Sequence, residues 1–114
     1  MKSISSRLIE LNTALNDINE NLTIYHYEKA EDASTPYGVW AETGEGNSDR
    51  KNNHKTEQTI EGYIDYFTFE EFDTLIDAIQ GALNGLEGCS WSLERAQYED
   101  NTKLIHYRWD WELI

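Results

Sequence analysis

The segment at residues 103–112 constrains the fold of this chain more than any other. Its residues alternate between an apolar set (Ile105, Tyr107, Trp109, Trp111) and a polar set (His106, Arg108, Asp110, Glu112). Successive side chains of a β-strand point to opposite faces, so this alternation predicts a strand in a sheet with one apolar face. Such a face has to be covered, and the chain therefore needs a second layer to pack against it.

Two other segments have the helical spacing that can supply this layer. In residues 4–18 the apolar side chains (Ile4, Leu8, Leu11, Leu15, Ile18) recur every three or four positions. This spacing places them on one stripe of a helix, and Ser3 is its predicted N-cap. The second such segment spans residues 69–84.

The ends of the second helix are predicted from capping patterns. Thr68 and Glu71 have the spacing of a capping box, and Phe67 with Phe72 has that of a hydrophobic staple. Gly85 is predicted to end the helix in a left-handed conformation. The predicted apolar face is Phe72, Leu75, Ile76, Ile79 and Leu83, and the predicted outer face is Glu70, Asp73, Asp77 and Gln80.

Four further segments are rich in the β-branched and aromatic residues typical of strands. They are residues 22–27, 37–41, 56–67 and 86–98, and residues 99–102 form the predicted turn before the last strand. The period of two in residues 56–67 directs Ile60, Ile64 and Tyr66 inward. We therefore expect a single α+β domain over residues 1–114, with two helices packed on a mainly antiparallel sheet and the order α-β-β-β-α-β-β.

One long segment, residues 44–55, contains no large apolar residue. Nothing in it can offset the entropy lost on ordering, so we expect it to be a mobile loop in the isolated protein. Arg50, Lys51 and Lys55 make it mildly basic in an acidic chain. These three residues are candidate contacts between copies of the chain, because they would be attracted to a neighbour's acidic surface.

Charge and composition exclude several classes of function. The chain has 9 Lys and Arg against 22 Asp and Glu, a formal charge of −13. We expect no direct nucleic-acid binding, which needs cations to neutralise phosphates, and no membrane association. The single cysteine, Cys89, cannot form an intramolecular disulfide, and the first residues do not resemble a secretion signal. We therefore expect the protein to be made and folded in a cytoplasm.

The residues that could carry chemistry do not form a catalytic pattern. His26, His54 and His106 have no paired spacing to one another or to Cys89, so the sequence predicts no metal, no cofactor and no enzymatic activity. Many carboxylates will lie near one another by chance on so acidic a surface, and a solvated surface is the simpler interpretation. Cys89 is predicted to be a small core residue.

The aromatic residues allow two interpretations. Tyr107, Trp109 and Trp111, together with Trp91, could form the core or a binding face, and the core is favoured because the predicted helices need a sheet to cover. Tyr63 and Tyr98 are predicted to lie on the opposite face. They are the aromatic candidates for contact with a partner.

Three segments resemble a known family. They are residues 37–40 (Tyr-Gly-Val-Trp), residues 62–68 (Gly-Tyr-Ile-Asp-Tyr-Phe-Thr) leading into the second helix, and residues 97–109, which turn from Gln97 through Asn101 to Trp109. With the element order and the long polar loop, they resemble the tail terminator and head-tail joining proteins of long-tailed, non-contractile bacteriophages.

The resemblance implies a structural subunit without catalytic residues. Such a subunit would assemble as a ring-shaped homo-oligomer, cap the tail tube, and contact both the tail tube protein and the head connector protein. It would be made in the host cytoplasm and reside in the virion. A symmetric ring reuses one surface patch against a complementary one, which suits a chain with no catalytic pattern.

The alternative is a small acidic inhibitor that mimics nucleic acid and binds a basic groove on a host protein. The charge of −13 permits it. Mimicry requires rows of acids on one face, and the predicted outer face of the second helix, with Glu70, Asp73 and Asp77, is the one candidate row. An enzyme is the third possibility.

Overall fold

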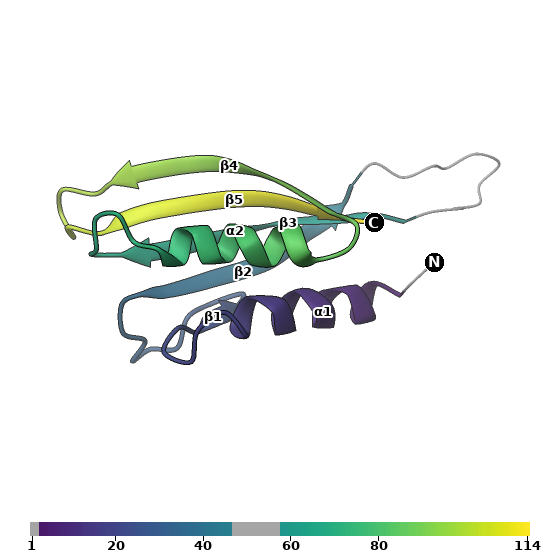
Figure 1. The fold of residues 1–114 in the computed structure, drawn as a ribbon, viewed down its shortest axis with the longest axis horizontal. Coiled ribbons are helices and arrows are strands. Elements are labelled where there is room, and N and C mark those ends of the chain that lie inside the picture. The colour runs from purple at the N-terminus through teal and green to yellow at the C-terminus, as the bar shows by residue number, and fades with distance from the viewer. Residues whose placement is uncertain (1–2, 47–57) are drawn as a thin grey trace.

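The computed structural model describes residues 3–46 and 58–114. Two helices and five strands follow in the order α1 (Ile4–Asn16), β1 (Ile24–His26), β2 (Tyr37–Glu45), β3 (Ile60–Thr68), α2 (Leu75–Gly85), β4 (Cys89–Tyr98) and β5 (Ile105–Leu113) (Figure 1). The predicted α+β fold and its element order are confirmed. Helix α1 ends at Asn16, two residues before the predicted end.

The sheet has the strand order β1-β2-β3-β5-β4. Only the short strand β1 is parallel to its neighbour, and every other pair is antiparallel. Strand β3 lies at the centre, paired along its whole length with β5. Ile60 lies opposite Leu113, and Ile64 lies opposite Trp109. Directly opposed residues share a face, so this register gathers the predicted inward side chains of both strands.

Both helices pack on that apolar face. Leu11 and Leu15 of α1, Ile79 and Leu83 of α2, and Trp109 of β5 are all fully buried. The rest of the core comes from the segment just before β1 and from the strands (Leu22, Ile24, Trp40, Ile60, Ile64, Tyr66, Trp111, Leu113). The core interpretation of the aromatic stripe is therefore correct, with Trp91 and Tyr107 partly buried at its margin.

Polar helix residues accept hydrogen bonds from the indole groups of two core tryptophans. Trp40 donates to Asn12 and Trp109 donates to Gln80, each over 3.1 Å. A buried indole N–H needs such an acceptor, because leaving it unpaired costs free energy. The prediction that Gln80 points outward is therefore wrong, since its side chain points toward the core and accepts the hydrogen bond from the Trp109 indole.

The predicted start of the second helix is also wrong. Thr68 is the last residue of β3, and α2 begins only at Leu75. Phe72 has φ 60° and its side chain is 87% exposed, so it forms no staple. Asp73 explains the late start, because its carboxylate accepts hydrogen bonds from the Tyr66 hydroxyl at 2.5 Å and the Leu75 amide at 2.9 Å. It is buried and was wrongly predicted to lie outside.

The predicted left-handed end at Gly85 is likewise wrong. Gly85 is the last helical residue, and the helix continues into an extended Leu86. The left-handed glycine is Gly88, at φ 76°, immediately before β4. The left-handed residue therefore serves the entry into the strand.

A β-bulge in strand β4 changes the predicted position of Tyr98. Leu93 lies opposite Trp109, but Arg95 lies opposite Arg108, so Glu94 is an extra residue in the pairing. An inserted residue reverses the alternation of every side chain that follows it. Tyr98 therefore lies opposite Ile105, on the face that carries the helices, and its predicted placement on the face opposite the aromatic stripe is wrong.

The predicted mobile loop falls mostly outside the described residues. Gly44 and Glu45, its first two residues, belong to β2 and pair with Glu61 and Ile60. Residues 47–57, which include Arg50, Lys51 and Lys55, lie beyond the part of the chain that the structure describes.

Glycine at position 62 is required by the close approach of two strands and an indole ring. A Cβ atom there would lie 2.1 Å from the Ala41 carbonyl oxygen and 2.4 Å from Cζ2 of Trp111. We expect Gly62→Ala to lower the free energy of unfolding by roughly 3 kcal/mol, because backbone and core must both shift. Denaturant unfolding measures this change.

Gly81→Ala is the matched control. No heavy atom lies within 4 Å of the corresponding Cβ position on α2. This substitution should raise the free energy of unfolding by about 1 kcal/mol, since alanine favours a helix. Equal effects of the two substitutions would contradict the close packing at Gly62.

Candidate interaction surface

The two faces of the sheet differ in their cover. Helices α1 and α2 pack on one face, and within residues 3–46 and 58–114 no helix lies over the other (Figure 1). We call this second side the open face. It comprises alternate residues of β2, β3, β5 and β4, including Tyr37, Val39, Glu61, Tyr63, Asp65, Phe67, Ser90, Ser92, Arg95, His106, Arg108, Asp110 and Glu112.

A row of stacked rings crosses three strands of the open face. Tyr37, Phe67 and His106 lie directly opposite one another on β2, β3 and β5. The Tyr37 and Phe67 rings stack with centroids 5.1 Å apart, and Phe67 stacks on His106 at 4.4 Å. Burial raises the pKa of Tyr37. Phe67, which was predicted to form a hydrophobic staple with Phe72, thus lies on the open face in a cross-strand aromatic ladder.

A charged network adjoins this row. Asp65 binds the His106 ring nitrogen at 2.8 Å and lies 3.6 Å from the Arg108 guanidinium, which is also 3.6 Å from Asp110. The guanidinium lies over the Tyr63 ring, 4.2 Å from its centroid, as in a cation–π contact. Tyr63, a predicted contact residue, is therefore half-buried and held in place by Arg108.

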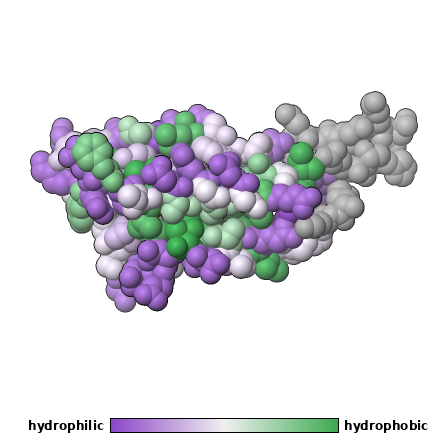
Figure 2. Space-filling view, viewed as in Figure 1, coloured by the Kyte–Doolittle hydropathy of each residue, from purple (hydrophilic) through white to green (hydrophobic). Residues whose placement is uncertain are grey.

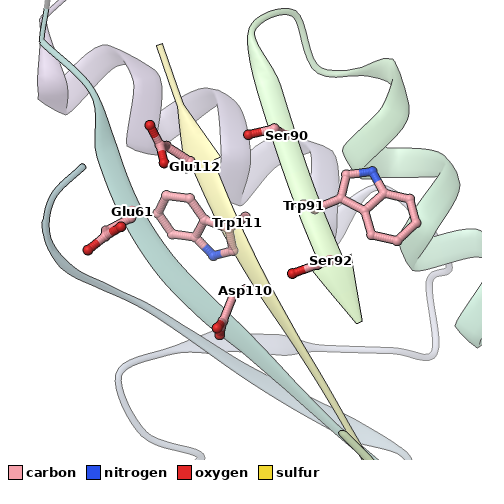
Figure 3. Close-up of a pocket in the computed structure, with 7 residues that line it drawn as sticks. All are labelled: Glu61, Ser90, Trp91, Ser92, Asp110, Trp111 and Glu112. Atoms are coloured by element: carbon pink, nitrogen blue, oxygen red, sulfur yellow. The ribbon is translucent and has the colours of Figure 1, made fainter. Parts of the chain in front are cut away.

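A shallow depression lies beside this network, across β3, β5 and β4. Its volume is about 260 Å³. Figure 3 shows its lining side chains, which are Glu61, Ser90, Trp91, Ser92, Asp110, Trp111 and Glu112. The open face thus has an acidic end next to Arg108 and Arg95, and this arrangement can attract a polar surface of mixed charge.

A second cluster joins β1 to β2. Glu42 accepts hydrogen bonds from the Tyr27 hydroxyl and pairs with the His26 ring nitrogen, both at 2.7 Å. The His26 ring stacks on Trp40 at 3.9 Å. Burial raises the pKa of Glu42, but the bonds from Tyr27 and His26 outweigh it and hold the pKa below its ordinary value. Because Tyr27 and His26 both bond to the Glu42 carboxylate, the cluster links the end of β1 to β2.

The remaining candidate groups carry little chemistry. Burial raises the pKa of the Cys89 thiol to about 11, so the thiol is protonated and a weak nucleophile at neutral pH. Among the residues that the structure describes, no group of three or more His, Cys, Asp or Glu side chains could hold a metal ion. Within the same ranges, no helix has the length and apolar character needed to cross a membrane.

The predicted row of acids does not form. Of its three members only Asp77 is an exposed residue of α2, since Glu70 precedes the helix and Asp73 is buried. The predicted row on α2 therefore gives nucleic-acid mimicry no support, because mimicry requires a row of evenly spaced acids on one face.

The predicted contact residues do not share one surface. Tyr63 lies on the open face, and Tyr98 lies on the opposite face at the end of β4, where it is 55% exposed. Sequence reasoning missed Asp65, His106 and Arg108 as a group, and the cluster around Glu42. The alternation of β5 did place His106 and Arg108 on one face, but the register with Asp65 had no sequence signal.

No protein-family model matches the chain, and a search of curated proteins finds no similar sequence. A function for the chain therefore depends on its own residues and their geometry.

The lowered pKa of Glu42 predicts a pH-dependent contribution to stability. Folding favours the ionised form, so this stabilisation is present above the ordinary value of 4.5 and is lost as the pH falls through the lowered pKa. We expect Glu42→Gln to lower the melting temperature at pH 7, and its difference from wild type to vanish at acidic pH.

Thermal unfolding across this pH range measures the effect. Glu20→Gln removes an exposed carboxylate just after α1 and should change the melting temperature little at any pH. A deficit of Glu42→Gln that persists at acidic pH would show that the ionised form of Glu42 is not what stabilises the fold.

Proposed function

We propose that this chain is a structural assembly protein of a phage virion. It forms a ring-shaped homo-oligomer that caps the tail tube and joins it to the head connector. The resemblance of residues 37–40, 62–68 and 97–109 to tail terminator and head-tail joining proteins suggests this role. The α+β element order is compatible with it.

The observation that best supports an assembly role is the open face. Tyr37, Tyr63, Phe67 and Arg108 form an ordered aromatic and cationic network there, and no helix within residues 3–46 and 58–114 covers it. Tyrosine and arginine are enriched at the centres of protein interfaces. Tyrosine brings a large contact area with few flexible bonds, and the planar arginine guanidinium stacks on rings and binds carboxylates through paired hydrogen bonds. A face of this composition favours contact with another protein over catalysis.

Self-association of this chain has to overcome charge repulsion. Subunits of charge −13 repel one another, so contact between copies requires local patches of opposite sign. The open face offers Arg95 beside an end that contains Glu61 and Glu112. Arg50, Lys51 and Lys55 remain our candidates for a second such contact.

We expect the triple substitution of Arg50, Lys51 and Lys55 by Gln to weaken ring formation and to leave the melting temperature unchanged. These residues lie outside the described core, and losing three positive charges increases the repulsion between subunits. Sedimentation velocity and native mass spectrometry measure the assembly, alone and with purified tail tubes. Electron microscopy of the tube ends scores capping.

A charge-matched control tests whether position matters. Lys29 and Lys103 are exposed bases outside that segment, and substituting both by Gln removes the same charge as substituting Arg50 and Lys51 by Gln. Equal effects of these two double variants would assign the loss to net charge alone. A wild-type chain that stays monomeric with tail tubes and leaves their ends uncapped would overturn the proposed function.

A further inference from the structure

The connection between β3 and α2, residues 69–74, exposes two of the chain's three phenylalanines. Phe69 is 61% exposed and Phe72 is 87% exposed. Phenylalanine is among the residue types most often buried in folded proteins, so two on one short connection are unusual. Figure 1 places this connection at the end of the molecule where β4 turns into β5, and Figure 2 shows that end as mainly hydrophilic with a small apolar group.

The backbone at Phe72 is held in a costly conformation. Its φ of 60° lies in the left-handed region, where a bulky side chain is a genuine outlier. The ring lies largely in solvent, so burial of the side chain does not offset this cost. If the connection served only to link β3 to α2, glycine or asparagine would adopt this backbone conformation with less strain.

Neighbouring residues fix the connection at both ends. The Asp73 carboxylate is buried and binds the Tyr66 hydroxyl, which comes from the centre of the sheet. The same carboxylate accepts from the Leu75 amide, and the Glu70 amide donates to Thr68 Oγ1 at 3.1 Å. Phe72 is therefore presented from a rigid base, so docking its ring would cost little ordering entropy.

The charges around this connection favour a basic partner. Glu70 and Glu71 are exposed beside the phenylalanines, and residues 69–74 contain no base. On the β4–β5 connection at the same end, Asp100 and Lys103 are both exposed, so the excess of negative charge comes from residues 69–74. A second copy of this chain, with charge −13, is a poor match for such a surface.

We propose that residues 69–74 form a docking knob, with Phe72 as its anchor, for an apolar pocket bordered by Lys and Arg on a different protein. The proposal rests on the proposed function, in which that protein is the tail tube protein or the head connector protein. Phe72 would fill the pocket, and Glu70 and Glu71 would pair with its basic border.

The test compares binding of Phe72→Gly and wild type to purified tail tubes and, separately, to purified head connector. Glycine adopts a positive φ without strain, so this variant should melt at or above the wild-type temperature and form the same rings. Its affinity for one of the two probes should fall about 30-fold, as for an aromatic anchor. Phe72→Tyr should keep binding within about threefold, because it retains the ring.

Ile9→Ala is the matched control, since Ile9 is 65% exposed on α1, away from the knob. It should bind both probes as wild type does. For the affected probe, wild-type affinity should fall as salt rises, and Glu70→Gln with Glu71→Gln should reduce that dependence. Wild-type affinity of Phe72→Gly for both probes would overturn the knob while leaving the proposed function intact. Loss of rings by a folded Phe72→Gly would also overturn it, by assigning the connection to contact between copies.

Discussion

The antiparallel register between β3 and β5 is the constraint on which the rest of the structure depends. It sets Ile64 opposite Trp109 and Gly62 opposite Trp111, so that one glycine provides the space for an indole ring. The Trp111 indole N–H then donates to the Tyr63 carbonyl oxygen at 3.1 Å, within the same pair of strands. A shift of one residue would turn these tryptophans to solvent, and the two helices would lose the surface they cover.

This constraint explains which parts of the fold were predictable from sequence. Two patterns repeat along the chain: the period of two in β3 and β5, and the helical spacing of the apolar residues. Because each pattern involves many residues, one residue that departs from it does not change the prediction. They were sufficient for the element order, the sheet class and most of the core. The failures arose at single residues, where a tertiary contact overrode a local pattern. Asp73 is buried against Tyr66 and delays α2, although Thr68 and Glu71 have the spacing of a capping box.

The candidate surfaces were less predictable, because they depend on pairing between distant segments. The period of two correctly placed His106 and Arg108 together, but nothing in sequence indicated that Asp65 lies between them. The extra residue at Glu94 carries no composition signal either, and it moves Tyr98 to the other face. Strand register and β-bulges are determined by the packing of the whole sheet, so no local sequence pattern predicts them directly.

The two faces of the sheet divide stability and contact between them. The face that carries the helices holds most of the large buried side chains, so the open face can carry half-buried rings and exposed charges with little consequence for the core. The connection after β3 extends this division, because the buried Asp73 directly adjoins the exposed and strained Phe72. Strain of this kind persists only where the surrounding structure over-determines it. Here the hydrogen bond from Tyr66 to Asp73 supplies that rigidity. The same bond delays α2, so that the predicted capping box does not form, and it holds the Phe72 ring in solvent, where a partner can reach it.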